Sequence, residues 1–129
     1  MSTWRRKAME CLPDYKSEFE SPDTGIYLVF STVLHSTIDA HKNNDAIQLQ
    51  KNYDFAAWCF SQKTTKDLWN AAAVAFYEHL GDHPATREAM PQWITRQTYD
   101  HIRVLLELRL DEATLKEIDA RFGIKKNKR

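Results

Sequence analysis

The stretch LWNAAAVAFYEHL, residues 68–80, decides the fold class of this 129-residue chain. Between Ala71 and Tyr77 every side chain is aliphatic or aromatic, so a helix there has no polar face to turn toward water. A helix that is apolar on all sides is surrounded by other elements. We therefore predict a central apolar helix over about residues 67–80, ended by Gly81 as a glycine C-cap.

Apolar residues also recur at helical spacing on both sides of this stretch. Before it, we expect helices over 4–12, 14–21, from about 23 to 43, and 45–62, with Pro13 ending the first and Asp45 capping the last. After it, residues 82–90 resemble a loop, and Pro91 suits the first turn of a helix that runs to about residue 110. Asp111 then caps a final helix that ends at Gly123. The prediction is an all-α single domain over residues 1–124, a compact bundle of five to six helices without strands.

Composition supports this fold class and bears on the compartment. Glycine and proline together number only seven, which argues against a turn-rich β-sandwich or barrel. Hydrophobic residues make up 43% and charged residues 28%, as in folded globular proteins. The longest apolar run, 71–77, is too short to span a membrane, and no apolar run follows the basic N-terminus. Cys11 and Cys59 do not form a disulfide framework, so we expect a cytoplasmic protein.

The charges are balanced in number but uneven along the chain. Eighteen basic and eighteen acidic residues give a formal net charge of zero. Residues 1–124 carry 14 basic and 18 acidic side chains, a net charge of −4, and the last five residues carry four basic ones. A mildly acidic body makes nucleic acid an unlikely partner. We expect residues 125–129 to be a basic disordered tail that contributes little to stability.

Several groups of polar residues in the sequence contain the residue types of a chemical site. Glu78, His79, Asp82 and His83 contain metal-ligand types, but Gly81 and Pro84 separate the two imidazoles. We therefore predict no metal and no cofactor. His35 and Asp39 are four residues apart, which favours a surface ion pair over a catalytic pair. Because no nucleophile, base and oxyanion-binding loop occur together, we predict no catalytic residue, and we expect Cys59 to pack in the core.

Two polar residues interrupt the apolar stretch and leave two interpretations open. Asn70 and Tyr77 are seven residues apart, so they share one side of a helix. They belong either to an internal hydrogen-bond network that fixes helix register or to a small polar pocket. The pocket would be lined by Tyr53, Asn70, Tyr77, Glu78 and His79.

An acidic segment near the N-terminus is the most partner-like surface in the sequence. Its aromatic residues are flanked by carboxylates, a combination that suits recognition of a basic protein surface. A solvated amphipathic helix is the alternative interpretation. The candidate partner-binding residues are Asp14, Tyr15, Glu18, Phe19, Glu20 and Asp23.

Two blocks carry a resemblance to a known family. Residues 53–59, YDFAAWC, and residues 68–80 are similar to the Y-x-F-A-x-W-C and N-A-x-x-V-A-F-Y-E-H-L blocks of a family of small, uncharacterised bacterial all-helical proteins. The start, Trp4 to Pro13, also resembles that family, so the likeness covers about residues 4–110. It is a domain of unknown function, so the resemblance implies no catalytic residue. It is more loosely similar to helical immunity proteins that neutralise bacterial toxins.

Together these features favour a non-enzymatic, cytoplasmic, protein-binding domain, with an immunity-type protein as one specific form. The partner is then another protein of unknown identity, and a homodimer is a further reading. The alternative function is a small ligand-binding or enzymatic helical bundle that uses the polar pocket around Asn70 and Tyr77.

Overall fold

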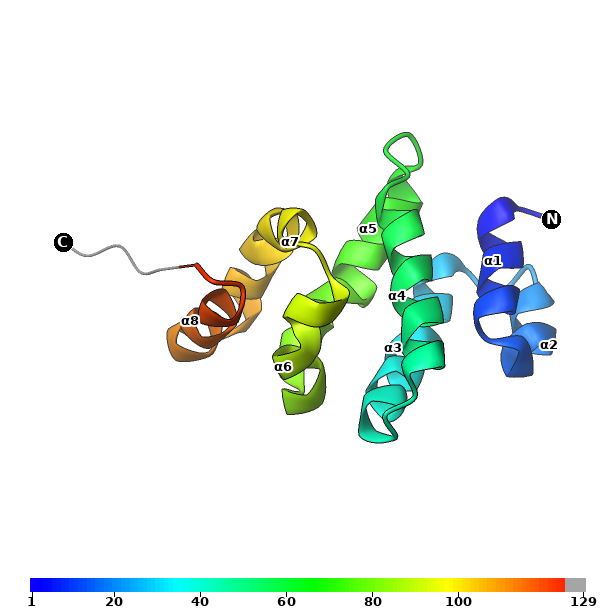
Figure 1. The fold of residues 1–129 in the computed structure, drawn as a ribbon. Coiled ribbons are helices and arrows are strands. Elements are labelled where there is room, and N and C mark those ends of the chain that lie inside the picture. The colour runs from blue at the N-terminus through cyan, green and yellow to red at the C-terminus, as the bar shows by residue number, and fades with distance from the viewer. Residues whose placement is uncertain (125–129) are drawn as a thin grey trace. The chain divides into compact units, whose positions relative to one another are not determined.

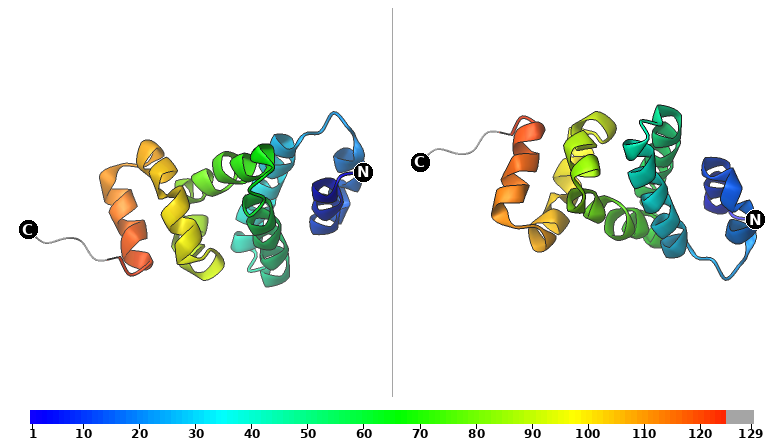
Figure 2. Two further views of the ribbon diagram at one scale, coloured as in Figure 1. Left: turned by 90° about the horizontal axis from the view of Figure 1, so that it is seen from above. Right: turned by 90° about the horizontal axis from the view of Figure 1, so that it is seen from below.

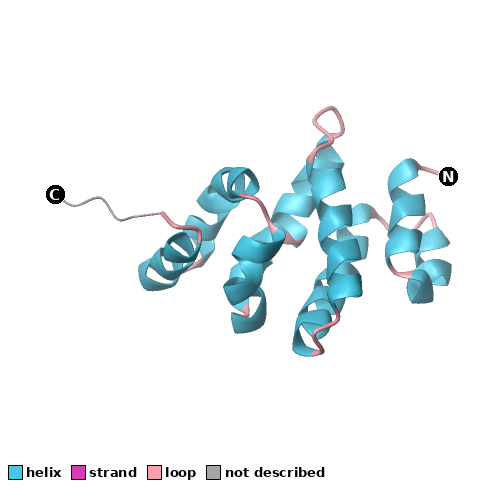
Figure 3. Ribbon diagram, viewed as in Figure 1, coloured by secondary structure: helices cyan, strands magenta, loops and turns pink. Residues whose placement is uncertain are grey.

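The computed structural model describes residues 1–124, and every regular element in that range is a helix (Figure 1; Figure 3). The elements are α1 (Thr3–Cys11), η1 (Pro13–Tyr15), α2 (Lys16–Glu20), α3 (Ile26–Lys42), α4 (Ala46–Phe60), α5 (Lys66–Ala75), η2 (Tyr77–Asp82), α6 (Pro84–Trp93), α7 (Arg96–Arg109) and α8 (Glu112–Arg121), where η denotes a 3-10 helix. The all-α prediction is confirmed. Five to six helices were too few, because eight α-helices form in residues 1–124. The expected tail at 125–129 lies outside the described residues.

The helices belong to two compact units, one from Met1 to Tyr77 and one that begins at Glu78. The first unit contains α1 to α5 and the second contains α6 to α8. Over the described residues, none of these helices combines the length and the apolar character that crossing a membrane requires.

Helix α4 is the central helix of the first unit. It packs against α1, α3 and α5, as the views from above and below show (Figure 2). The apolar helix α5, which we expected at the centre, packs within this unit against α3 and α4. It buries Ala71 and Ala72, whose small side chains let the neighbouring backbones come close. Trp69 of the same helix is 36% exposed.

Aromatic rings fill the core of the first unit. Phe76 is fully buried, and its ring centroid lies 5.9 Å from that of Phe30, 5.7 Å from that of Tyr53 and 5.4 Å from that of Tyr77. Edge-on and tilted geometries of this kind bring the ring edges against the neighbouring faces. Phe76 therefore joins residues of α3, α4 and the end of α5 into one cluster.

The helix predicted over residues 67–80 is broken at Phe76. Helix α5 ends at Ala75, Phe76 has φ −128° and ψ −72°, and the chain continues as η2. Phe76 and Tyr77, on the two sides of this break, are both buried.

Gly81 was expected to cap that helix, but the structure gives it a different role. It is buried inside η2, where an added Cβ would lie 2.7 Å from Cδ1 of Leu110. The absence of a side chain thus permits close packing within the second unit. The predicted glycine stop at Gly123, by contrast, is confirmed by its φ of +79° and by the end of α8 at Arg121.

The helix boundaries predicted around Pro84 and Pro91 of the second unit are wrong. Residues 82–90 were expected to be a loop, but Pro84 starts α6, because its fixed φ suits the first helical turn. Pro91, expected to begin the next helix, lies in the last turn of α6, where its missing N–H costs a single backbone bond. Helix α7 begins after Thr95, whose hydroxyl accepts a hydrogen bond from the Thr98 N–H. Asp111 caps α8 as predicted.

Candidate functional site

The acidic N-terminal segment lies on η1, α2 and the turn that follows. Asp14, Glu18, Glu20 and Asp23 are exposed, and within the described part of the chain none of them forms an ion pair. Tyr15 is 43% exposed. Four carboxylates are thus available to a partner together with one aromatic ring.

Phe19, which was predicted to belong to that surface, is not part of it. Its side chain is fully buried, because α2 packs against α1 and Phe19 faces that contact. The guanidinium of Arg5 fixes the segment further, since its Nη1 donates to the carbonyl oxygens of Phe19, Ser21 and Thr24 at 2.6, 2.8 and 2.9 Å. The segment is therefore held in place by α1, with its carboxylates outside and Phe19 inside.

Next to this segment is a cleft of about 270 Å³, which we call the acidic cleft. Three acidic residues from three elements line it: Asp14 from η1, Asp39 from α3 and Asp45 from the start of α4. Asp45 also caps α4 by accepting a hydrogen bond from the Gln48 N–H at 3.1 Å. None of the lining residues is basic. They are Leu12, Pro13, Asp14, Tyr15, Ser36, Asp39, Ala40, Asn43, Asp45 and Gln48.

The ion pair expected between His35 and Asp39 is absent from the described residues. Both side chains are exposed, and water solvates such charges well enough that the pairing gains little. Asp39 instead contributes its carboxylate to the acidic cleft.

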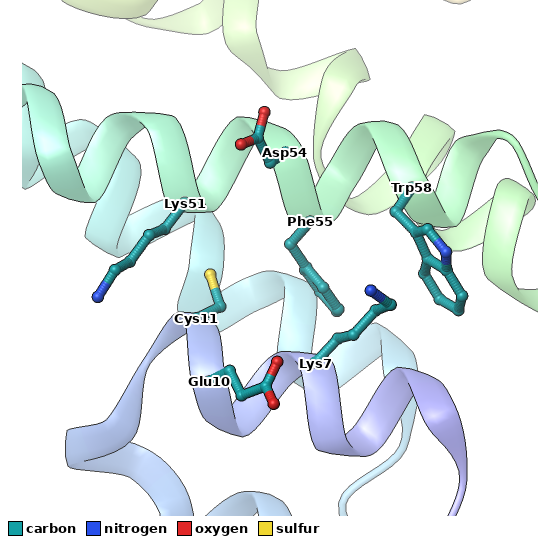
Figure 4. Close-up of a pocket in the computed structure, with 7 residues that line it drawn as sticks. All are labelled: Lys7, Glu10, Cys11, Lys51, Asp54, Phe55 and Trp58. Atoms are coloured by element: carbon teal, nitrogen blue, oxygen red, sulfur yellow. The ribbon is translucent and has the colours of Figure 1, made fainter.

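A second cleft, of about 310 Å³, lies between α1 and α4 (Figure 4) and is called the α1–α4 cleft. The rings of Phe55 and Trp58 point from α4 toward α1. The Nζ of Lys7 lies 5.0 Å from the centroid of the Trp58 ring, within the range of a cation–π contact. The lining residues are Lys7, Glu10, Cys11, Lys51, Asp54, Phe55 and Trp58.

A buried amide holds together the helices around both clefts. Asn52 is fully buried on α4, and its Oδ1 accepts hydrogen bonds from the Cys11 thiol at 3.2 Å and from Gln48 Nε2 at 2.8 Å. Its Nδ2 donates to the hydroxyl oxygens of Ser36 and Thr37, each at 3.1 Å. The network ties α1, α3 and α4 together. Sequence reasoning missed it, although an asparagine beside the aromatic Tyr53 on a mostly apolar helix was a usable signal.

Neither cysteine is poised for chemistry. Burial raises the pKa of the Cys11 thiol to about 12, and burial raises the pKa of Cys59 to about 12 as well. Both thiols are protonated near neutral pH, and nucleophilic attack requires the thiolate. Cys59 is fully buried, as the prediction of a core position requires.

The polar pocket proposed around Asn70 and Tyr77 is not assembled in the first unit. Asn70 donates through Nδ2 to the hydroxyl of Tyr27 at 2.7 Å near the surface. Tyr77 is 1% exposed and packs edge-on against Phe60, and burial raises its pKa. Because the chain breaks at Phe76, Asn70 and Tyr77 do not share a helix face. Of the two interpretations, a hydrogen bond between helices fits Asn70, which links α5 to α3, whereas the buried network of this unit is formed by Asn52.

Tyr53, the third predicted pocket residue that lies in the first unit, pairs with His41 through its hydroxyl. Its hydroxyl lies 2.8 Å from Nε2 of His41, with the two rings edge-on. Burial raises the pKa of Tyr53 and lowers the pKa of half-buried His41. The pair is therefore neutral at physiological pH and links the end of α3 to α4.

The remaining pocket residues, Glu78 and His79, lie in the second unit and are paired there. Arg109 donates to Asp82 Oδ2 at 2.7 Å and to Glu78 Oε2 at 3.5 Å, and His79 Nδ1 lies 3.2 Å from Asp82. Burial raises the pKa of Asp82, but hydrogen bonds from Arg109 and His79 outweigh it, so the pKa is lowered. These carboxylates neutralise Arg109. Over the described residues no group of three or more potential ligands is arranged for a metal ion.

A second charged cluster in this unit was not foreseen. Asp119, nearly buried on α8, accepts hydrogen bonds from Tyr99 at 2.5 Å and from Arg103 Nε and Nη2 at 2.9 and 2.6 Å. The hydrogen bonds from Arg103 lower the pKa of Asp119. Tyr99 also stacks on Phe122 with 4.0 Å between centroids. The arrangement fixes α7 against α8 and leaves the carboxylate fully engaged.

The chain belongs to the family described as a domain of unknown function, DUF7674, which matches residues 5–109. This confirms the expectation of a family without an assigned activity. No curated protein and no solved structure matches the chain. The family thus supplies no activity, and a function has to be argued from the geometry.

Proposed function

We propose that this chain is a non-enzymatic, protein-binding domain whose first unit receives a basic segment of a partner protein at the acidic cleft. The observation that carries the proposal is the convergence of Asp14, Asp39 and Asp45 on one cleft without a basic residue in its lining. A guanidinium or ammonium group entering the cleft would supply the missing positive charge.

Further carboxylates near the cleft add to its negative electrostatic potential. Glu18, Glu20 and Asp23 lie on the segment that continues from Asp14 and Tyr15, all exposed. Exposed Lys16 lies in the same segment, so residues 13–23 carry four carboxylates and one ammonium group. A net negative surface charge of this kind steers an oppositely charged partner during association. The Tyr15 ring beside the cleft offers an apolar face and a hydroxyl, the combination favoured at protein interfaces.

The free, buried thiols of Cys11 and Cys59 support a reducing compartment such as the cytoplasm for this binding. The looser resemblance to immunity proteins suggests one class of partner, a toxin whose active site the first unit would cover. The enzymatic alternative has less support, since its proposed pocket residues point to separate partners.

Selection of short random peptides displayed on phage, with the immobilised full chain as bait, tests the proposal. We expect the enriched peptides to share Arg or Lys. The double variant Asp14→Asn with Asp39→Asn should bind them at least about fivefold more weakly, and added salt should weaken wild-type binding. Glu88→Gln, an exposed acid of the second unit, is the matched control and should change affinity by less than about twofold. Peptides without basic residues, or equal losses in both variants, would overturn the proposal.

A further inference from the structure

The acidic cleft and the α1–α4 cleft lie along one face of α4. Gln48 lines the first, and Lys51, Phe55 and Trp58 line the second. These four residues follow one another at spacings of three, four and three, which places them on a single stripe of the helix. From α1 the lining passes from Cys11 in one cleft to its neighbour Leu12 in the other. A segment that enters the acidic cleft thus needs to advance only about one helical turn to reach the other.

The rim of the α1–α4 cleft carries charges of both signs that are not paired with each other. Lys7 precedes Glu10 by three residues, and Lys51 precedes Asp54 by three, a spacing that allows ion pairs on a helix. Within the described part of the chain neither pair forms one. Lys7 lies over the Trp58 ring instead, and Asp54 accepts a hydrogen bond from Gln50 at 2.8 Å. The two lysines therefore form no ion pair with the two carboxylates, and the Lys7 side chain reaches the Trp58 ring (Figure 4).

The interior of this cleft suits apolar contact more than chemistry. Phe55 is buried and Trp58 half-buried, and their rings face the space between α1 and α4 (Figure 4). The Cys11 thiol donates to Asn52 Oδ1 and is held as a neutral donor. The volume of about 310 Å³ is at the small end of ligand pockets, which range over about 300–1,000 Å³. An apolar centre with a charged rim is the arrangement found where a partner inserts one anchoring side chain.

We propose that the α1–α4 cleft receives a large apolar side chain, aromatic or long aliphatic, from the same partner segment whose basic residue enters the acidic cleft. The inference rests on the proposed function, because it assigns a second contact to the same partner. The charges balance: a rim of two lysines and two carboxylates repels neither sign of flanking residue, whereas the acidic cleft selects the basic one. The partner segment is therefore defined by a basic residue that enters the acidic cleft and a large apolar residue that enters the α1–α4 cleft.

The peptides selected on the full chain also test this inference. We expect the enriched sequences to contain a large apolar residue in addition to Arg or Lys. Trp58→Ala should weaken binding by about tenfold or more, as for an interface anchor. Trp69→Ala is the matched control: it removes the same side chain from a partly exposed position of the same unit, and it should change affinity by less than about twofold. Circular dichroism melting shows whether each variant is folded.

Two measurements keep the test independent of the folding of Trp58→Ala. Alanine replacement of the apolar residue in the peptide should cause a loss similar to that of Trp58→Ala, without altering the protein. In the wild type, the indole N–H resonance of Trp58, identified with Trp58→Phe, should shift when the peptide binds.

The possible results separate this inference from the proposed function. Peptides that depend on Asp14 and Asp39 but lack an apolar consensus, and that leave the Trp58 indole unshifted, would overturn the inference and retain the proposed function. Sensitivity to Trp58→Ala without sensitivity to the aspartate variant would keep the α1–α4 cleft as a site and overturn the basic partner. Failure to enrich any peptide would overturn both.

Discussion

The two units of this chain use charged side chains in opposite ways. All eight ion pairs of the described residues lie in the second unit, where Arg103 and Arg109 bind Asp119 and Asp82. The first unit forms none. It is held together by the aromatic cluster around Phe76, by the neutral network of Asn52 and by hydrogen bonds from Arg5 to backbone carbonyl oxygens.

This difference indicates which unit has charges to offer a partner. A carboxylate that already accepts two hydrogen bonds from an arginine, as Asp119 does, would have to break them before it could bind anything else. The carboxylates of the first unit form no ion pair that a partner would have to break. Carboxylates therefore serve stability in the second unit, whereas in the first unit they can serve recognition.

The largest expected effect concerns the aromatic core of the first unit. Phe76→Ala removes a fully buried ring that contacts three others and should lower the free energy of unfolding by roughly 3–5 kcal/mol. Chemical denaturation of the full chain measures it. Trp69→Ala, at a partly exposed position, should cost under about 1 kcal/mol. Wild-type stability of Phe76→Ala would show that the aromatic cluster does not hold this unit together.

In the second unit the comparable change is the loss of an arginine. Arg103→Met keeps the aliphatic stem but leaves the nearly buried Asp119 with Tyr99 as its hydrogen-bond donor, and it should cost about 2–3 kcal/mol. Arg121→Met removes an arginine from a surface pair with Glu117 and should cost less than about 0.5 kcal/mol. If the two substitutions cost the same, ion pairs do not stabilise this unit selectively.

Loss of the neutral Asn52 network of the first unit should lower the free energy of unfolding less than Phe76→Ala does. Asn52→Ala removes the donor to Ser36 and Thr37 and the acceptor of the Cys11 thiol, which should cost about 1–3 kcal/mol. Gln50→Ala, on the exposed side of the same helix, should stay within about 0.5 kcal/mol. Equal denaturation midpoints for these two variants would contradict the network's role.

We expect acid to unfold the second unit at a higher pH than the first. The pKa values of Asp82 and Asp119 are lowered in the fold, so their contribution to stability is present above the unfolded value and is lost as the pH falls below about 4. Trp93 lies in the second unit, and the other three tryptophans lie in the first. With fluorotryptophan labelling, the Trp93 resonance should report unfolding at a higher pH than that of Trp58. The reverse order would contradict the division of charge.

The smallest expected change in stability is at the acidic segment. Reversing Glu18 and Glu20 to Lys should leave the free energy of unfolding within about 0.5 kcal/mol of wild type, because both are exposed and unpaired among the described residues. It should slow association with a basic peptide, since the local field changes sign. Stopped-flow mixing at low and high salt measures this rate, and an unchanged rate would place the binding surface elsewhere.

Local rules of helix formation were enough to predict much of the fold. Asp45 and Asp111 are caps because their side chains accept from the backbone three residues on, a relation that is visible in sequence. The break at Phe76 was not visible, because neither glycine nor proline marks it in residues 68–80. The position of Pro91 was predicted wrongly because proline is tolerated in the last turn of a helix as well as in the first.

The candidate site was predictable only in part. The acidic residues from Asp14 to Asp23 could be recognised as a run, but the burial of Phe19 and the arrival of Asp39 and Asp45 depend on how α2, α3 and α4 pack. The same applies to Asp119, whose partners lie 16 and 20 residues away. Periodicity identifies which residues share a helix face, whereas clefts and charged clusters arise between helices.

The most direct test of the division of charge compares two pairs of aspartates under identical conditions. Asp14→Asn with Asp39→Asn neutralises two carboxylates of the first unit, and Asp82→Asn with Asp119→Asn neutralises two of the second. The measurement is the free energy of unfolding of the full chain in denaturant. We expect a change within about 0.5 kcal/mol for the first pair and a loss above about 2 kcal/mol for the second. Equal losses, or a larger loss for the first pair, would contradict the account.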